Sequence, residues 1–293
     1  RSPHERLLRP TSGSNVSRTP HQDLFGSITP SDLHYERHHA GVPEIDPVGY
    51  QLLVHGMVER PTIFTLDDLK HFPAVSRIAF LECSGNYGRN AGPDSKPEQI
   101  CGLTSQSEWT GVALSTLLRE VGASSDATWL VAEGQDAAVM TRSVPMEKAW
   151  NDAMVAYGQN GEPIRPAQGY PARLFLPGWE GNANVKWLRR IELADRPFMT
   201  REETSKYTDP LADGTARQFS FVFDARSIIT KPAYPETIEP GWVEIRGIAW
   251  SGRGAIARVE ISSDGGRSWT NARLQEPVLP KAHVRFRHLW SWD

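Results

Sequence analysis

The chain has 293 residues, of which 39% are hydrophobic and 23% charged, and its formal net charge at pH 7 is −3. This balance excludes an intrinsically disordered chain and a basic protein that binds nucleic acid through its charge. Because of this charge balance, we expect no nucleic-acid partner. No apolar run approaches the roughly 20 residues of a membrane-spanning helix, so we also expect no membrane insertion. The length permits one large domain or two ordinary ones, and we expect two.

The first segment, residues 1–30, carries Pro, Ser, Thr, Asn and Arg without apolar periodicity. It predicts an irregular N-terminal arm that lies over the surface or on a neighbour. The chain begins at Arg1 and shows no signal-peptide pattern there. We therefore expect a targeting segment to be absent or already removed.

Short strands and short helices in mixed order are predicted from residue 49 onward. Residues 50–55 and 75–81 indicate strands, and residues 66–71 indicate a helix, with Asp67 and Asp68 suited to its start.

A longer helix and another strand follow. The apolar spacing of residues 112–121 predicts an amphipathic helix that Gly122 stops, and residues 128–132 predict a buried strand. The region from 31 to 222 is therefore expected to be α+β.

From residue 223 to residue 293 apolar and polar positions alternate, without a helix signal. The run Ser262-Ser263-Asp264-Gly265-Gly266-Arg267 predicts a tight hairpin turn, because Asp-Gly supplies the positive φ values that such turns need. Residues 286–292 predict a last strand. An immunoglobulin-like β-sandwich is the economical interpretation, and ending at Asp293 it would be incomplete.

The most conspicuous local feature is Leu81-Glu82-Cys83-Ser84-Gly85-Asn86, a cysteine at the end of a strand and before a glycine-containing loop. Such a thiol is presented rather than buried. With Cys101 as the only other cysteine, a disulfide framework and a thiolate-rich zinc site are excluded. Cys83 is then a buried thiol beside an ordinary turn, a ligand for a soft metal, or a nucleophile, and spacing alone leaves these open. Any role of Cys101 also stays open.

The chain contains one cluster of histidines, formed by His34, His38 and His39. One helical turn would bring His34 and His38 together as metal ligands, whereas a solvated polar loop is the simpler alternative.

Basic residues flank the loop Pro177-Gly178-Trp179-Glu180-Gly181-Asn182, whose glycines would let backbone N–H groups approach an anion. Solvated charges at strand ends are an equally good interpretation. The basic residues are Arg173, Lys186, Arg189 and Arg190.

No phosphate-binding loop, dinucleotide-binding glycine motif, nucleophile elbow or Cys-x-x-Cys-His haem motif occurs in the sequence. The usual nucleotide and haem cofactors are therefore not expected in this chain.

From about His34 to its end, the chain resembles the sulfite oxidase family of molybdopterin enzymes. Residues 80–86 resemble the metal-ligand motif of the family, which implies that Cys83 binds molybdenum. Residues 35–47 resemble the opening stretch that contacts the cofactor. This implies contacts from Tyr35, Arg37, His38 and His39, with Arg37 facing the substrate.

Further segments match the family in order. Residues 169–173 and 184–187 resemble the cradle of the pterin phosphate, and residues 204–210 resemble the segment that carries the active-site tyrosine. The resemblance implies cofactor contacts from Asp136, Gln168, Arg173, Asn184, Val185 and Lys186. It implies Cys83, Arg37 and Tyr207 as the catalytic residues.

Within the family, residues 158–162, 177–182 and 204–210 most resemble the molybdenum subunits of the bacterial sulfane dehydrogenases, which belong to a thiosulfate-oxidising system. This implies a mixed α/β molybdopterin-binding domain followed by an immunoglobulin-like dimerisation domain. It also implies oxidation of sulfane sulfur on a carrier protein, with electrons passed to a c-type cytochrome subunit. The expected assembly is a periplasmic heterotetramer that contains a homodimer of this subunit, with no haem in this chain.

Two positions depart from the animal and plant sulfite oxidases. Their arginine five residues after the cysteine is Gly88 here, beside Arg89, and their cofactor-contacting histidine is Gln168. A free sulfite dianion would meet less positive charge, which favours a carrier-bound substrate. Family members are also expected to continue for tens of residues beyond Asp293.

Three alternatives remain open. The first is a periplasmic sulfite dehydrogenase that acts on free sulfite. The second is a hydrolase with Cys83 as nucleophile and His38 or His39 as base. The third is a binding protein that has kept the fold without the chemistry.

Overall fold

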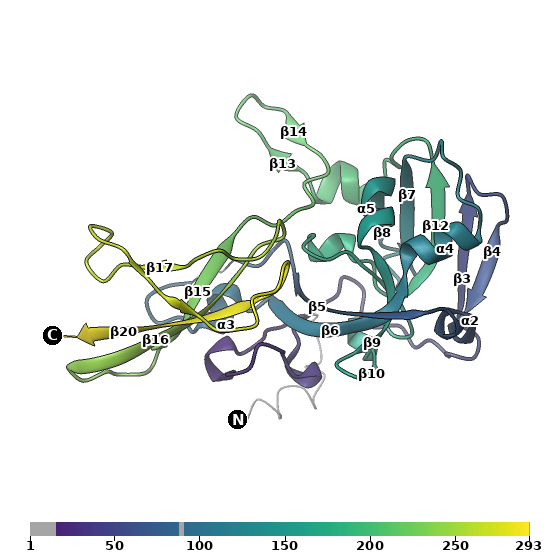
Figure 1. Cartoon of the computed structure of the whole chain (residues 1–293). Coiled ribbons are helices and arrows are strands. Elements are labelled where there is room, and N and C mark those ends of the chain that lie inside the picture. The colour runs from purple at the N-terminus through teal and green to yellow at the C-terminus, as the bar shows by residue number, and fades with distance from the viewer. Residues whose placement is uncertain (1–15, 88–90, 293) are drawn as a thin grey trace. The chain divides into compact units, whose positions relative to one another are not determined.

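The computed structural model describes residues 16–87 and 91–292 (Figure 1). The chain divides into two compact units. The second unit comprises His38–Arg77 and Glu108–Phe221, and the first combines the stretch up to Arg37 with Ile78–Ser107 and the residues from Val222 onward. Each unit is therefore assembled from stretches that are distant along the chain. The domain boundaries predicted after residues 30 and 222 stay a prediction.

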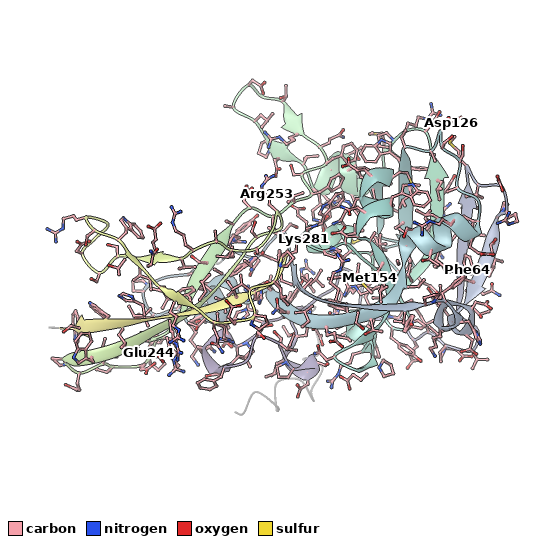
Figure 2. The ribbon with its side chains drawn as sticks, viewed as in Figure 1. Phe64, Asp126, Met154, Glu244, Arg253 and Lys281 are labelled. Atoms are coloured by element: carbon pink, nitrogen blue, oxygen red, sulfur yellow. The ribbon has the colours of Figure 1, made fainter. Side chains whose placement is uncertain are left out.

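The second unit is centred on a five-stranded sheet in the order β4-β3-β12-β7-β8. Strand β12 runs parallel to β3 and antiparallel to β7. Phe64 and Met154, labelled in Figure 2, are among the buried side chains of this unit. The predicted strands at 50–55 and 128–132 are confirmed as β3 and β7, with small shifts at their ends. The strands are β3 (Gln51–Gly56), β4 (Thr62–Thr65), β7 (Trp129–Gly134), β8 (Thr141–Pro145) and β12 (Leu188–Ala194).

The helix predicted at residues 66–71 is confirmed as α2 (Leu66–His71). The Thr65 hydroxyl accepts a hydrogen bond from the backbone N–H of Asp68 at 3.1 Å, and the Asp68 carboxylate accepts from the N–H of Thr65 at 2.8 Å. This reciprocal cap satisfies two backbone donors that the helix leaves open. The other α-helices in the described residues are α3 (Pro97–Cys101), α4 (Leu114–Glu120) and α5 (Met146–Asn151).

The helix predicted at residues 112–121 begins later than expected, as α4 at Leu114. Val112 and Ala113 are the last residues of β6 (Thr104–Ala113), where they pair with Val155 and Met154. A buried strand residue adds to the same apolar pattern as a helix residue, so the pattern could not locate the boundary. The expected stop at Gly122 is confirmed, with a φ of 65°.

A second five-stranded sheet has the order β10-β9-β6-β5, with β11 paired to β9. The predicted strand at 75–81 is confirmed as β5 (Ala74–Glu82). Strands β5 and β6 each contain residues of both units. The other strands are β9 (Met154–Gln159), β10 (Glu162–Pro163) and β11 (Arg173–Phe175).

In the first unit, the described residues after Val222 contain strands and no helix, as predicted. Four strands pair in the order β15-β16-β20-β19, and the last predicted strand is confirmed within β20. Two short pairs, β1-β2 and β17-β18, also belong to this unit. The strands are β1 (Val16–Ser17), β2 (Glu36–Arg37), β15 (Arg226–Lys231), β16 (Gly241–Trp250), β17 (Glu260–Ile261), β18 (Thr270–Asn271), β19 (Arg273–Leu274) and β20 (Val284–Trp292).

The hairpin predicted around residues 262–267 is present, but its turn is not tight. The loop between β17 and β18 runs from residue 262 to residue 269. The Asp264 carboxylate accepts hydrogen bonds from the N–H groups of Arg267 and Ser268 at 2.9 and 3.0 Å, and these bonds organise the longer loop. Gly265 has the predicted positive φ, at 74°.

The N-terminal arm is partly buried over its described part. Thr19, His21, Gln22 and Thr29 are buried, whereas Phe25 is 68% exposed. The backbone N–H of Thr19 donates to the carbonyl of Gly102 at 2.8 Å. Hydrogen bonds, rather than an apolar pattern, hold the buried residues, and the irregular surface arm stays a prediction. The remainder of the predicted arm, residues 1–15, lies outside the described residues.

Two buried histidines of the first unit predict a pH-dependent stability. Burial, aided by the positive charge of Arg285, lowers the pKa of His21 from 6.5 to about 3, and burial also lowers the pKa of His283. The unfolded chain then binds more protons than the folded chain between pH 6.5 and about 3. The free energy of unfolding should therefore fall as the pH is lowered through this window.

We expect each histidine to contribute a fall of up to about 1.4 kcal/mol per pH unit. Urea unfolding of wild type and of a His21→Gln variant at several pH values in this window measures the slope. The variant should show a shallower dependence, and equal slopes would contradict the assignment.

Irregular elements connect the strands that carry the candidate site residues. They are the 3-10 helices η1 (His21–Asp23), η2 (Ser31–Leu33), η3 (Pro166–Gln168) and η4 (Gly181–Ala183), the π-helix η5 (Glu202–Lys206), and the pair β13 (Asp209–Pro210) and β14 (Ala216–Arg217). Within residues 16–87 and 91–292, no helix has the length and apolar character needed to cross a membrane.

Candidate functional site

The loop after β5 carries Cys83 in the first unit, and this side chain is half-buried. The backbone N–H of Cys83 donates to the carbonyl of Leu103 at 2.9 Å, and its carbonyl accepts from the N–H of Asn86 at 2.9 Å. The N–H of Gly85 donates to the Sγ atom of Cys83 at 3.4 Å. Such a donor stabilises negative charge on sulfur. The prediction that the strand end presents this thiol is confirmed, because the side chain is only half-buried. The Gly85 donor suits a Cys83 thiolate that binds a metal.

Cys101 has the opposite surroundings. Its side chain is buried, and burial, followed by the negative charge of Glu82, raises the pKa of the thiol to about 11. The Asn86 amide donates to its Sγ atom at 3.1 Å. Cys101 therefore stays protonated at neutral pH and packs as a small apolar side chain.

The candidates near the N-terminus are not arranged as a helical turn. Residues Glu36–Arg37 form β2, so the chain between His34 and His38 is extended. Both histidines are buried, and the Nδ1 atom of His34 lies 3.0 Å from the carbonyl oxygen of Tyr35. The proposal of His34 and His38 as ligands on one helical turn is wrong, and so is the solvated loop. The first unit holds His34, Tyr35 and Arg37, whereas His38 and His39 belong to the second.

Tyr35 and Arg37 are fixed through the backbone of the first unit. Tyr35 is buried, and its N–H donates to the hydroxyl of Ser105 at 2.9 Å. Arg37 pairs with Val16 in the β1-β2 ladder, and its side chain is half-buried.

Lys186 is the centre of a basic group in the second unit. Its Nζ atom donates to the carbonyl of Ala167 at 2.9 Å and lies 3.3 Å from the Nδ1 atom of His38. The same Nζ atom lies 4.3 Å from the ring centroid of Trp187. An ammonium held in place by a carbonyl and an aromatic face can still offer charge to an anion.

Arg173 is buried beside this group. One terminal nitrogen of Arg173 donates to the carbonyl of Gln168 at 2.9 Å and the other to the carbonyl of Asn184 at 3.0 Å. The guanidinium thereby joins the two segments that resemble the phosphate cradle. Between them, a Cβ atom on Gly169 would lie only 3.0 Å from the Cβ of Lys186. Gly169 also has a φ of 111°, so the close approach of these backbones requires glycine.

The remaining predicted contacts are buried and engaged with the backbone. The side-chain oxygen of Asn184 accepts from the N–H of Leu176 at 2.6 Å, and the Val185 carbonyl accepts from the N–H of Leu174 at 2.8 Å. The Asp136 carboxylate accepts from the N–H of Met140 at 3.1 Å. These bonds define the shape of the loops that carry the predicted contacts.

Tyr207 follows the π-helix η5 and is half-buried. Its hydroxyl lies 3.2 Å from the Nε2 atom of His39, so the structure brings these two predicted residues together. The guanidinium of Arg142 lies 5.0 Å from the centroid of the Tyr207 ring.

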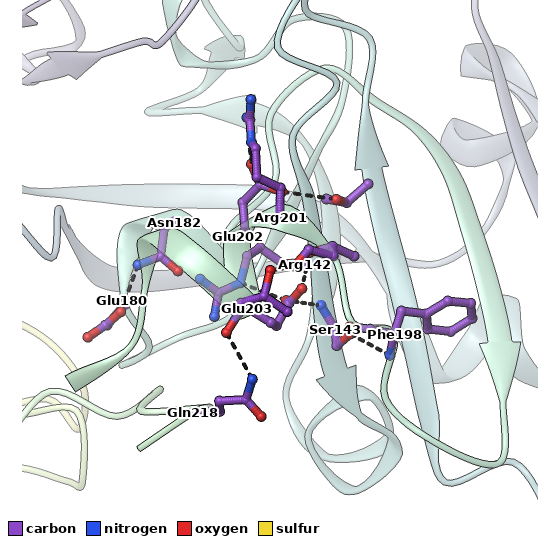
Figure 3. A network of polar contacts seen from close by, with 12 residues as sticks. Arg142, Ser143, Glu180, Asn182, Phe198, Arg201, Glu202, Glu203 and Gln218 are labelled. Carbon is purple, nitrogen blue, oxygen red and sulfur yellow. Dashed lines mark hydrogen bonds and ion pairs between the residues drawn. The ribbon is translucent and has the colours of Figure 1, made fainter. Parts of the chain in front are cut away.

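Arg142 was not predicted from the sequence. It lies on β8 and forms an ion pair with Glu203 of η5 at 3.2 Å, with side chains that are 1% and 0% exposed. The Glu203 carboxylate also accepts from the N–H of Ser143 at 2.8 Å (Figure 3). These contacts tie the π-helix to β8. The sequence carried a signal for it, because Arg142 and Val144 are two residues apart in a strand and so lie on the same face. An arginine on a buried face needs a buried partner of opposite charge.

The predicted residues thus form two groups in two units. Tyr35, Arg37 and Cys83 belong to the first, and His38, His39, Asp136, Gln168, Arg173, Asn184, Val185, Lys186 and Tyr207 belong to the second. Gly88 and Arg89, where the sequence departs from the animal and plant enzymes, lie outside the described residues.

The chemistry of these groups fits molybdopterin. In the described parts of the chain, no group of three or more His, Cys, Asp or Glu side chains could hold a metal ion. The Cys83 thiolate would suit a soft metal that already carries sulfur ligands, as a metal bound by molybdopterin does. A glycine-dependent backbone approach beside Lys186 and Arg173 fits an anionic cofactor tail.

Comparisons with known proteins agree with this chemistry. The family model for the oxidoreductase molybdopterin binding domain matches residues 39–202, and the model for the Mo-co oxidoreductase dimerisation domain matches residues 217–293. Mitochondrial sulfite oxidase of Drosophila melanogaster is 31% identical over 97% of this chain and 54% of its own length. The chain belongs to the sulfite oxidase family of molybdopterin enzymes. The predicted mixed α/β cofactor-binding region followed by a β-rich dimerisation region is confirmed for this member of the family.

The chain is also similar to a sulfane dehydrogenase of known structure and to a nitrate reductase. The crystal structure of sulfane dehydrogenase SoxCD from Paracoccus pantotrophus aligns with a TM-score of 0.92 and 45% identity, over 98% of this chain and 75% of that chain. Nitrate reductase of Ulva prolifera is 29% identical over 94% of this chain and 36% of its own length. The chain spans about half the length of the sulfite oxidases that it matches, as the 54% for the Drosophila enzyme illustrates.

The Lys186 group gives a prediction for cofactor binding. A Lys186→Met variant keeps a similar side-chain length but loses the charge, so cofactor retention should fall about 10- to 100-fold. Molybdenum analysis and pterin fluorescence after gel filtration measure retention. Arg196→Met is the control, because Arg196 is 86% exposed in the same unit. Full retention by the Lys186 variant would rule out a charge contact.

Proposed function

We propose that this chain is the molybdenum-bearing part of a sulfur-compound dehydrogenase that oxidises sulfane sulfur bound to a carrier protein during thiosulfate oxidation. The observation that carries the proposal is the half-buried Cys83 on a backbone-held loop, in a chain that is 45% identical to a protein named sulfane dehydrogenase. The replacement of a family arginine by Gly88 supports a substrate that needs no clamp for a free dianion.

When bound, the molybdenum cofactor supplies two-electron oxidation of sulfur, with water as the source of oxygen. Cys83 holds the metal through a thiolate whose charge the Gly85 N–H stabilises. Lys186 and the loops joined by Arg173 bind the anionic part of the cofactor. These residues position the cofactor and do not react themselves.

Arg37 and Tyr207 serve the substrate. In this proposal the Arg37 guanidinium orients anionic oxygen on substrate or product, and the Tyr207 hydroxyl donates a hydrogen bond near the reacting oxygen. The contact with His39 at 3.2 Å orients that hydroxyl before substrate arrives. Neither residue acts as a covalent nucleophile.

The proposal extends to the assembly. Electrons leave to a c-type cytochrome subunit, since the sequence carries no haem-attachment motif. The complex named SoxCD and the match to a dimerisation model support a partner subunit and a homodimer within a heterotetramer. We propose the periplasm as its location.

The test is a steady-state comparison of two substrates with the purified holoenzyme and a cytochrome acceptor. We expect the thiosulfate-loaded carrier protein to be oxidised with a much higher kcat/KM than sulfite. Turnover of sulfite with no turnover of the loaded carrier would establish the alternative, a sulfite dehydrogenase. The sulfite oxidases among the relatives make that alternative the one to exclude.

A further inference from the structure

The loop that presents Cys83 is closed at both ends by a polar cluster, here called the loop anchor, which consists of the buried Glu82, Asn86 and Trp250 and of Arg226, whose side chain is 30% exposed. Glu82, the last residue of β5, is 0% exposed. One carboxylate oxygen accepts from the Asn86 amide at 2.9 Å and contacts Arg226, and the other accepts from the Trp250 indole N–H at 2.6 Å. Glu82, the residue directly before Cys83, is therefore held by the side chains of Asn86, Arg226 and Trp250.

Arg226 connects the two ends of the loop. Besides its ion pair with Glu82, its second terminal nitrogen donates to the backbone carbonyl of Asn86 at 3.0 Å. The side-chain oxygen of Asn86 in turn accepts from the N–H of Leu103 at 2.7 Å. Residues 82 and 86 are thus fixed to the same guanidinium, with Cys83 between them.

Two of the three side chains that hold Glu82, those of Arg226 and Trp250, come from the stretch matched by the dimerisation model, residues 217–293. Arg226 is the first residue of β15 and Trp250 the last of β16, and the two lie opposite each other in the ladder. All four members of the loop anchor belong to the first unit.

The energetics favour a firm anchor. A fully buried carboxylate is costly unless both of its oxygens have hydrogen-bond partners. Without Arg226, Glu82 would retain only neutral donors, and the backbone carbonyl of Asn86 would lose the guanidinium donor. The two ends of the loop would then no longer share one guanidinium, and the segment with Cys83 between them would be less ordered.

We propose that Arg226 and Trp250 are positioning residues for Cys83, so that the region named for dimerisation also sets the orientation of the metal-binding thiolate. The role at the metal rests on the proposed function of Cys83. The ordering of the loop does not, because it follows from contacts within the chain.

The first test measures backbone hydrogen exchange at the amides of Cys83 and Asn86, which needs no cofactor. Both amides donate to backbone carbonyls within the loop region, at 2.9 Å. In Arg226→Met, exchange at both should accelerate about 10- to 100-fold, the factor expected for loss of one hydrogen bond to a charged group. Arg226→Lys should recover part of the protection. Arg253→Met, which removes an exposed ion pair with Asp224 in the same unit, should match wild type.

The second test uses the holoenzyme. We expect Arg226→Met and Trp250→Phe to shift the Mo(V) electron paramagnetic resonance signal, which reports the metal–thiolate geometry, while gel filtration shows an unchanged oligomeric state. Trp250→Phe keeps the ring and removes only the N–H donor, so it serves if the arginine variant does not fold. Unaltered exchange and an unaltered signal in the folded variants would overturn the proposal, as would changes that appear only with loss of the dimer. Accelerated exchange with an unaltered signal would overturn the role at the metal, separately from the loop anchor itself.

Discussion

A Cys83→Ser variant is expected to lose its molybdenum and with it all measurable sulfur oxidation. Removal of a residue that only supports a metal ligand typically lowers affinity or activity about 10- to 100-fold, so loss of the proposed ligand itself should exceed that range. A serine hydroxyl stays protonated at neutral pH and is a poor ligand for a soft metal. Molybdenum analysis together with the carrier-protein assay measures both effects.

The matched control is Cys101→Ser, which makes the same atomic change in the other cysteine. Cys101 is buried, with its pKa raised to about 11, so it is not expected to bind metal. Its variant should retain molybdenum. Retention of metal by the Cys83 variant, or its loss only in the Cys101 variant, would refute the ligand assignment.

An Arg142→Met variant is expected to lose about 3–5 kcal/mol of unfolding free energy, because it leaves the Glu203 carboxylate buried without its cation. Both side chains are essentially inaccessible to water, at 1% and 0% exposed. Urea denaturation of the purified chain at neutral pH measures the loss. A further Glu203→Gln substitution in the same chain should restore part of it, since the uncompensated charge is then removed.

The control for this effect is Arg165→Met. Arg165 also pairs with a glutamate, Glu162, at 3.3 Å, but each side chain is 45% exposed. An exposed pair of this kind contributes about 0.2–1 kcal/mol. Similar losses in the Arg142 and Arg165 variants would show that burial of the Arg142–Glu203 pair is not decisive.

Local chemistry made part of the fold predictable. Helix α2 begins where expected, because Thr65 and Asp68 cap each other within four residues of sequence. The start of α4 was not predictable, because Val112 belongs to a buried strand whose partner, Val155, is more than forty residues away. The burial of Thr19 and Thr29 in the N-terminal stretch was not predictable for a related reason. Thr19 and Thr29 are held by hydrogen bonds to distant backbone groups, which leave no apolar pattern.

The candidate site was predictable only as far as the motifs reach. The presentation of Cys83 follows from its place between a strand and a glycine loop. The resemblance pointed to Tyr207 and His39, and the structure places them in contact. Arg142 and Arg226 were overlooked, because each lies outside the motifs and acts through a partner that is distant in sequence, Glu203 or Glu82.

The assignment of residues 78–107 to the same compact unit as the C-terminal stretch limits how such proteins can be cut or recombined. A fragment ending at Phe221 would keep Phe80 but lose Phe223 and His283, whose rings lie 6.2 and 5.8 Å from it. Exchange of residues 222–293 between relatives would replace only one of the two stretches that pack together in this unit. Chimeras should therefore fold only when residues 78–107 are exchanged together with residues 222–293.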